Sequence, residues 1–333
     1  MTLHPGILAL LLGSGLTSAM LGYAAWQGVR IIRYWDIRSG SEHQLELERR
    51  TYLVSTIISY ALGFQLLSLL LFIYTADTLS PMFIGAMCAA GSLNVNGFGY
   101  PTLILKIVSC LLAGLWLIVN ATDNQAHDYP LIRTKYWLLL VLTPVMIAET
   151  SLQGWYLLSL KPNIITSCCA ILFSTDANPV MSELLSLPRS FSQPAFFASA
   201  AITIALGLSV YLRTKGAIFF SLASLLHCLI SMVALISFIS MYIYELPTHH
   251  CPFCILHPEY NYIGYPIYGA ILVSAICGTG TGVIHPFRTI ASLHEVVPAM
   301  QKRLTLVSIF STLALVLIAG YSLLSSNLTL AAY

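Results

Sequence analysis

Eight long apolar runs constrain this chain more than any other feature of its sequence. They lie at about residues 6–28, 52–75, 101–120, 136–158, 195–212, 217–244, 262–284 and 304–325. A helix of about 20 mostly apolar residues crosses the hydrocarbon core of a bilayer. Only 8% of the 333 residues are charged, against roughly 25% in a soluble domain. The sequence therefore predicts an all-α polytopic bundle of about eight transmembrane helices, surrounded by membrane lipid.

The basic residues are distributed unevenly between the two sides of this bundle. Twelve of the fifteen lie between alternate pairs of runs, and only Lys106, Lys161 and Arg189 lie toward the other side. Because cytoplasmic loops hold the excess of Lys and Arg, we expect both termini to be extracytoplasmic in a bacterial inner membrane. No basic residue precedes the first run, which favours a retained helix over a cleaved signal peptide. The net charge of +2 gives no reason to expect a nucleic-acid partner.

A short string recurs about half a chain apart. Asn96-Gly-Phe-Gly-Tyr-Pro101 opens one apolar run, and Asn261-Tyr-Ile-Gly-Tyr-Pro266 opens another. An internal duplication would explain this, with residues 1–165 as a four-helix half whose outer loop surrounds Cys88, and residues 166–333 as a second half with a Cys-x-x-Cys loop. Convergence explains it equally well, because Pro suits a first helical turn and Tyr suits the membrane interface. On either interpretation we expect one integral membrane domain.

The eight cysteines fall into two groups. Three lie within apolar runs, where a thiol acts as a small hydrophobic group: Cys110, Cys228 and Cys277. The other five lie on the outward side, in what would be an oxidising compartment: Cys88, Cys168, Cys169, Cys251 and Cys254. Adjacent cysteines rarely bond to each other, because a good disulfide needs its Cα atoms farther apart than those of neighbouring residues. We therefore expect Cys168 and Cys169 to find other partners.

The densest set of reactive side chains is His249-His250-Cys251-Pro252-Phe253-Cys254-Ile255-Leu256-His257. Proline after the first cysteine is typical of the first position of a helix, so we expect a short helix to begin there. The helix dipole and the flanking histidines would favour the thiolate of Cys251, which is the attacking species. The spacing also predicts that Cys254 and His257 share one face.

Three chemical interpretations of this segment remain open. In the first, Cys251 and Cys254 exchange disulfides with an exported thiol protein through Cys168 or Cys169, and pass electrons to a membrane quinone near Tyr260 and Tyr265. In the second, soft ligands bind copper or zinc for transport or for assembly of an exported metalloprotein. The ligands of that site would be His249, His250, Cys251, Cys254, His257 and Cys88. In the third, a static disulfide staples a non-catalytic subunit that docks an exported partner.

Four further features inside the runs give expectations of their own. Glu149 is a candidate proton acceptor or cofactor-binding residue, because ionisable groups inside a membrane are costly and commonly functional. We expect Lys106 to extend toward the nearer interface. His227 is the only histidine deep in a run, which disfavours bis-histidine haem. The Gly278-Thr-Gly-Thr-Gly282 string favours close helix packing over a phosphate loop.

The Cys251-Pro-Phe-Cys254 stretch resembles the membrane disulfide oxidases of the DsbB family and their vitamin K epoxide reductase relatives. The likeness covers about twenty residues. It implies a redox-active dithiol at the outward mouth of a helix in a four-helix bundle, with a quinone as electron acceptor. The sequence departs from that family after the dithiol, where His257-Pro258 stands in place of a Gln-Arg pair.

Overall fold

The computed structural model describes residues 4–36, 41–166, 189–213, 215–247 and 249–328. These residues form helices and connecting turns, and the only β-pairing among them is an isolated parallel bridge between Ile84 and Ile165. Eight of the described helices are long and apolar enough to cross a membrane. The predicted all-α polytopic fold is therefore confirmed.

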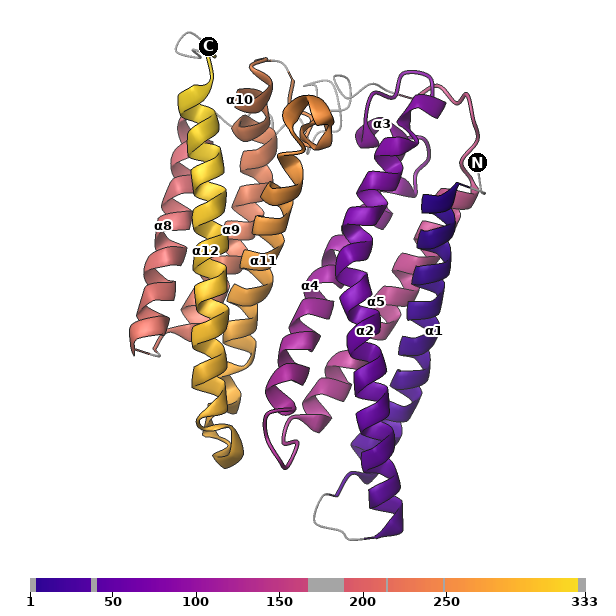
Figure 1. The fold of residues 1–333 in the computed structure, drawn as a ribbon, viewed down its shortest axis with the longest axis vertical. Helices are drawn as coiled ribbons and strands as arrows, with labels where there is room; N and C mark the ends of the chain where they lie inside the picture. Colours follow the sequence, from indigo (N-terminus) through magenta and orange to yellow (C-terminus); the bar gives the residue numbers. More distant parts are fainter. Residues whose placement is uncertain (1–3, 37–40, 167–188, 214, 248, 329–333) are drawn as a thin grey trace. The chain divides into compact units, whose positions relative to one another are not determined.

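The chain divides into two compact units. The first comprises Met1–Thr75, Asn96–Lys161 and Pro286–Ala299. Its long helices run alongside one another (Figure 1), and α5 packs against both α1 and α4. They are α1 (Pro5–Tyr34), α2 (Glu42–Thr78) as far as Thr75, α4 (Gly99–Asp123) and α5 (Ile132–Leu158). The core of this unit includes Trp116 and Tyr136, both fully buried.

The second unit comprises Ala76–Val95, Pro162–His285 and Met300–Tyr333. Within it, α9 packs against both α8 and α11. Its helices are α3 (Ala89–Leu93), α8 (Arg189–Arg213), α9 (Ala217–Ala234), α10 (Ser240–Tyr244), α11 (Gly264–Val283) and most of α12 (Val296–Ser325). A π-helical turn, Leu235–Ile239, joins α9 to α10 in one continuous span. Single 3₁₀ turns at Ser80–Met82, Cys254–Leu256 and Pro258–Tyr260 shape the loops of this unit.

The glycine string of α11 lies at a close helix contact. A Cβ atom added at Gly278 would lie 2.2 Å from Ser224 Oγ, and one added at Gly282 would lie 2.4 Å from Ser221 Cβ. Both serines belong to α9. The two glycines thus allow the helix backbones to approach, as small residues commonly do in membranes. The expectation of close packing is confirmed.

Several helices extend well beyond their predicted ends, α1 and α2 among them. Helix α1 continues to Tyr34, and α2 begins at Glu42 instead of near residue 52. Apolar length marks only the part of a helix inside the bilayer, and a polar helix can continue outside it. Good helix formers and an ion pair between Glu46 and Arg50, one turn apart, stabilise the start of α2.

The recurring string has the same local role in both of its copies. Helix α4 begins at Gly99 and α11 begins at Gly264, which are the equivalent glycines of the two strings. The prediction that each string opens a helix is confirmed. Descent of the two halves from one duplicated unit stays a prediction.

Candidate three-thiol site

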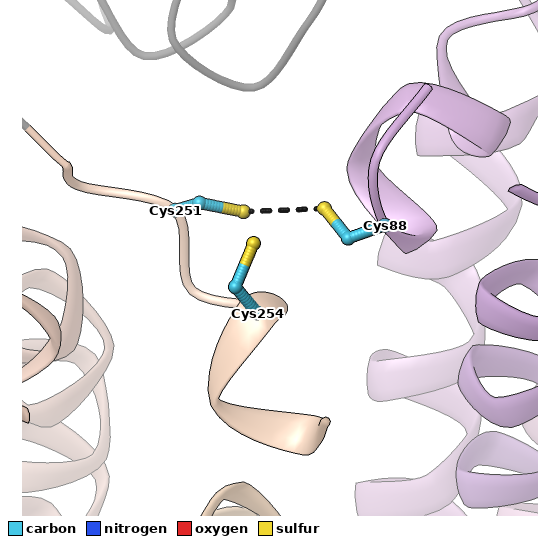
Figure 2. A group of neighbouring side chains, drawn as sticks. All are labelled: Cys88, Cys251 and Cys254. Carbon is cyan, nitrogen blue, oxygen red and sulfur yellow. Dashed lines mark hydrogen bonds between the residues drawn. The ribbon is translucent and has the colours of Figure 1, made fainter. Parts of the chain in front are cut away.

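Three cysteine sulfurs of the second unit converge on one point. Cys88, Cys251 and Cys254 have sulfur atoms that all lie within 4.8 Å of one another. The Sγ atoms of Cys88 and Cys251 are 3.5 Å apart. Figure 2 shows the three side chains directed toward a common centre from two segments of the chain. All three residues are buried, with 0%, 1% and 9% of their surfaces exposed.

Cys88 is held by a tightly folded loop between α2 and α3. It is the residue before the first turn of α3, and the next residue, Ala89, donates its backbone N–H to Asp77 Oδ1 at 3.0 Å. The loop closes on itself at Gly91, where an added Cβ would lie 2.7 Å from the Cα of Ala86. A larger residue at position 91 would therefore push apart the two sides of the loop that carries the thiol.

Two tyrosines anchor the backbone of the Cys-x-x-Cys segment. Tyr244 donates its hydroxyl to the carbonyl of Cys251 at 2.6 Å, and Tyr268 donates to the carbonyl of Pro252 at 2.6 Å. The turn that follows Cys254 packs on the start of α11, where a Cβ at Gly264 would lie 2.8 Å from the side chain of Ile255. The dithiol is thus fixed to two membrane helices through backbone contacts.

A His–Asp pair joins the two cysteine-bearing segments. His257 Nε2 lies 2.9 Å from Asp77 Oδ1, the oxygen that also accepts the N–H of Ala89. Both side chains are partly exposed. Asp77 therefore links the residue after Cys88 to the turn after Cys254.

The expected helix at the dithiol is wrong. Pro252 lies in a bend, and a single 3₁₀ turn begins only at Cys254. Because one turn of three residues has little aligned dipole, the helix-end argument for a reactive Cys251 does not hold. The expectation that Cys254 and His257 share one face also depends on an α-helix at this position. In the structure the His257 ring contacts Asp77 instead.

The other predicted histidine ligands have partners of their own. The ring of His249 packs edge-on against Tyr244 with their centroids 4.7 Å apart. His250 Nδ1 lies 3.1 Å from the carbonyl of Ile236. Among the described residues, the group with metal-ligand spacing consists of the three sulfurs, and neither histidine belongs to it.

The predicted tyrosines lie at the start of α11, with Tyr260 in the turn before it and Tyr265 in its first turn. Tyr260 lines a pocket of about 530 Å³ between the end of α10, the turn before α11 and the end of α12. Its ring packs on Tyr244 with their centroids 4.8 Å apart. Burial first, and then the charges of Cys254 and Glu259, raise the pKa of Tyr260. Tyr265 contacts the ring of Tyr262, with a centroid distance of 6.3 Å.

Cys168 and Cys169 lie outside the described residues. The chain that leads to them is described as far as Thr166, which is tied to the loop of Cys88. Thr166 donates its backbone N–H to Ile84 at 2.9 Å and its hydroxyl to the carbonyl of Gly91 at 3.0 Å. One residue, Ser167, separates this anchor from Cys168 in the sequence.

Glu149 lies in the first unit, in a buried polar network. It forms an ion pair with Lys106 at 2.7 Å, and both side chains are fully buried. Gln65 and Ser109 each donate to its second oxygen at 2.6 Å. The expectation that Lys106 extends toward the interface is wrong, because an inward carboxylate offers it a partner that a lone lysine lacks.

Sequence reasoning missed Asp77, Tyr244 and Tyr268. For Asp77 a signal was present, since it is a lone carboxylate just after the apolar run 52–75. The tyrosines act through backbone contacts, which leave no pattern in the sequence. Comparison with protein-family models, curated proteins and solved structures returned no match to this chain.

Proposed function

We propose that this protein is a membrane thiol–disulfide oxidoreductase whose redox centre consists of Cys88, Cys251 and Cys254. The observation that carries the proposal is the meeting of three buried sulfurs within 4.8 Å of one another. Three thiols at this separation allow a disulfide between any two of them to be attacked by the third. A static staple needs only two, so the third sulfur favours exchange.

The chemistry balances as a two-electron transfer. Cys251 and Cys254 lose two hydrogen atoms and form one disulfide, and a quinone gains two electrons and two protons to become a quinol. In the reverse half of the cycle, a substrate dithiol reduces the Cys251–Cys254 disulfide by exchange and is itself oxidised. Within the centre, the Cys88 thiolate attacks Cys251 in its disulfide with Cys254, forms a Cys88–Cys251 disulfide and releases Cys254 as a thiolate. The sulfurs of Cys88 and Cys251 lie 3.5 Å apart, which suits this exchange.

The pocket beside Tyr260 supports a quinone as electron acceptor. Its volume of about 530 Å³ is in the range of roughly 300–1,000 Å³ that is typical of small-molecule sites. Apolar side chains, including Leu317 and Ile318, line it together with the Tyr260 ring. Besides burial, the charge of a Cys254 thiolate contributes to the raised pKa of Tyr260. A quinone ring bound in this pocket would therefore be separated from the dithiol by the side chain of Tyr260.

Burial of the three thiols calls for a relay to the outside. A folded exported protein cannot bring its thiols to sulfurs with 0% and 1% exposure. We assign this relay to Cys168 and Cys169, which follow Thr166 and the loop of Cys88 in the chain. The charge distribution supports an extracytoplasmic location for this face, in a bacterial inner membrane.

Quinone reduction by the purified, prereduced protein tests the proposal. We expect one quinol to form for every two thiols lost, and we expect Cys251→Ser and Cys254→Ser to abolish quinol formation. Cys277→Ser is the matched control, because Cys277 lies within α11, and it should react at the wild-type rate. If thiols are lost without quinol, or if the Cys277 variant loses as much activity, the proposal is wrong.

Binding of a soft metal is the second candidate, and the same geometry favours it. A metal held about 2.3 Å from three sulfurs sets them about 4 Å apart, which agrees with the observed grouping within 4.8 Å. Thiolate-only coordination suits Cu(I) best. Elemental analysis under reducing conditions separates the two: one copper per chain, lost in Cys88→Ser but retained in Cys110→Ser, would support the metal function.

A further inference from the structure

A polar pocket lies between α1 and α2 in the first unit, at the end of the helices that carries the basic residues. Its volume is about 440 Å³, and its lining includes Gln27, Arg30, His43 and Arg50. The guanidinium of Arg30 stacks over the ring of Trp26, 4.5 Å from its centroid. Arg50 pairs with Glu46, so two arginines and one histidine face a single carboxylate. The pocket therefore favours an anion.

An apolar groove continues from this pocket along the same pair of helices. It has a volume of about 330 Å³, and its lining includes Ala19, Tyr23, Val54 and Ile57. On α1 the groove ends at Ala24 and the polar pocket begins at Gln27, and on α2 they adjoin between Arg50 and Val54. On each helix, the last residue of one hollow and the first residue of the other are about one helical turn apart. Small side chains such as Ala19 leave the space that forms the groove.

The polar pocket and the apolar groove follow one another along α1 and α2, as the polar headgroup and the acyl chain do in a lipid. Eleven residues separate Arg30 from Ala19, which is about 16 Å along a helix and comparable to much of an acyl chain. The groove residues lie within the apolar runs 6–28 and 52–75 of α1 and α2, which places the groove in the hydrocarbon region. The charged pocket lies at the ends of those runs. An anion without a tail would use only half of this surface.

We propose that the α1/α2 groove binds a phospholipid with an anionic headgroup. The phosphate lies between Arg30 and Arg50, and one acyl chain follows the groove past Ala19 and Ile57. The site is independent of the three-thiol centre, which belongs to the second unit. Basic pockets between transmembrane helices are suited to such headgroups, and each basic residue contributes about 1 kcal/mol near an anionic surface.

Lipid titration of the purified full-length protein in detergent, followed by native mass spectrometry, tests the proposal. We expect phosphatidylglycerol to bind about ten- to thirty-fold more tightly than phosphatidylcholine with the same acyl chains, as two basic contacts imply. Arg30→Gln with Arg50→Gln should remove this preference. The matched control is Arg33→Gln with Arg49→Gln, which removes the same charge from exposed neighbours outside the pocket and should keep it.

A second pair of variants tests the acyl-chain half. Ala19→Trp fills the groove and should weaken both lipids, whereas Leu16→Trp, at a side chain that is 63% exposed and outside the groove, should weaken neither. Equal binding of the two lipids by wild type would overturn the proposal. If the two double arginine variants lost the preference for phosphatidylglycerol equally, the proposal would also be overturned, because any basic residue on this side would then have the same effect. Full displacement of the lipid by millimolar inorganic phosphate would indicate an anion site without a tail.

Discussion

The sulfur of Cys88 lies 3.5 Å from the sulfur of Cys251, although 163 residues separate them in the chain. The loop after α2 and the loop before α11 therefore meet at a sulfur–sulfur contact. Neither loop places its thiol by regular secondary structure. Asp77, Gly91, Tyr244 and Tyr268 hold the two backbones by individual contacts. The centre is therefore expected to be sensitive to single substitutions outside its cysteines.

The first prediction concerns the short contact between Cys88 and Cys251. With Cys254→Ser, mild oxidation should join these two residues in a disulfide, because their sulfurs already touch. Non-reducing peptide mapping would detect the linked peptides. The double variant Cys254→Ser with Cys88→Ser should leave Cys251 open to alkylation. A Cys254→Ser protein in which Cys251 stays reactive after oxidation would contradict the observed geometry.

The second prediction concerns Asp77 as the link between the segments. Asp77→Ala removes both the acceptor for Ala89 N–H and the partner of His257, and it should lower the yield of that Cys88–Cys251 disulfide several-fold. Asp77→Asn keeps an oxygen acceptor and should lower it less. Glu259→Ala is the control, since Glu259 is 69% exposed and 3.8 Å from His257. Equal yields in the three variants would show that Asp77 positions nothing.

The third prediction concerns the buried ion pair of Lys106 and Glu149. Lys106→Met or Glu149→Gln alone leaves one charge without its partner in a fully buried network, which should cost about 3–5 kcal/mol in the free energy of unfolding. The double variant should recover most of that loss, because no isolated charge remains. Unfolding in mixed micelles measures all four proteins. Additive losses would contradict the pairing.

The fourth prediction concerns the contact between α9 and α11. Gly278→Ala places a methyl group 2.2 Å from Ser224 Oγ, and overpacking of this kind typically costs about 1–3 kcal/mol. Gly269→Ala is the control on the same helix, because a Cβ there meets nothing within 4 Å. Thermal unfolding of the two variants in detergent compares them. A Gly269 variant as unstable as the Gly278 variant would remove close packing as the cause.

Hydropathy predicts the eight spans because burial in lipid requires a long apolar run for each of them. The helix ends were less predictable, since α2 begins in polar residues outside the bilayer and depends on contacts such as that of Glu46 with Arg50. Whether Lys106 forms a buried ion pair or extends to the membrane interface depends on which face of α5 carries Glu149. That relationship between two helices is tertiary, and a single run of residues does not contain it.

The thiol site was predictable in part. Sequence spacing singled out Cys251 and Cys254, and it named Cys88 as a candidate ligand or fifth thiol. It could not exclude the histidines, because their partners Asp77, Tyr244 and Ile236 come from other segments. The recurring string also pointed to Cys88. It lies eight residues before Asn96 of the recurring string, and Cys254 lies seven residues before Asn261 of the second copy.

Differential alkylation of the membrane-embedded protein tests the central claim most directly. Protein held reduced and protein equilibrated with oxidised quinone would each be alkylated, digested and mapped. The redox function predicts that two of Cys88, Cys251 and Cys254 become protected together on oxidation and are released together on reduction, while Cys110, Cys228 and Cys277 stay unchanged in both states. Alkylation of the three clustered cysteines that does not depend on the redox state would contradict it.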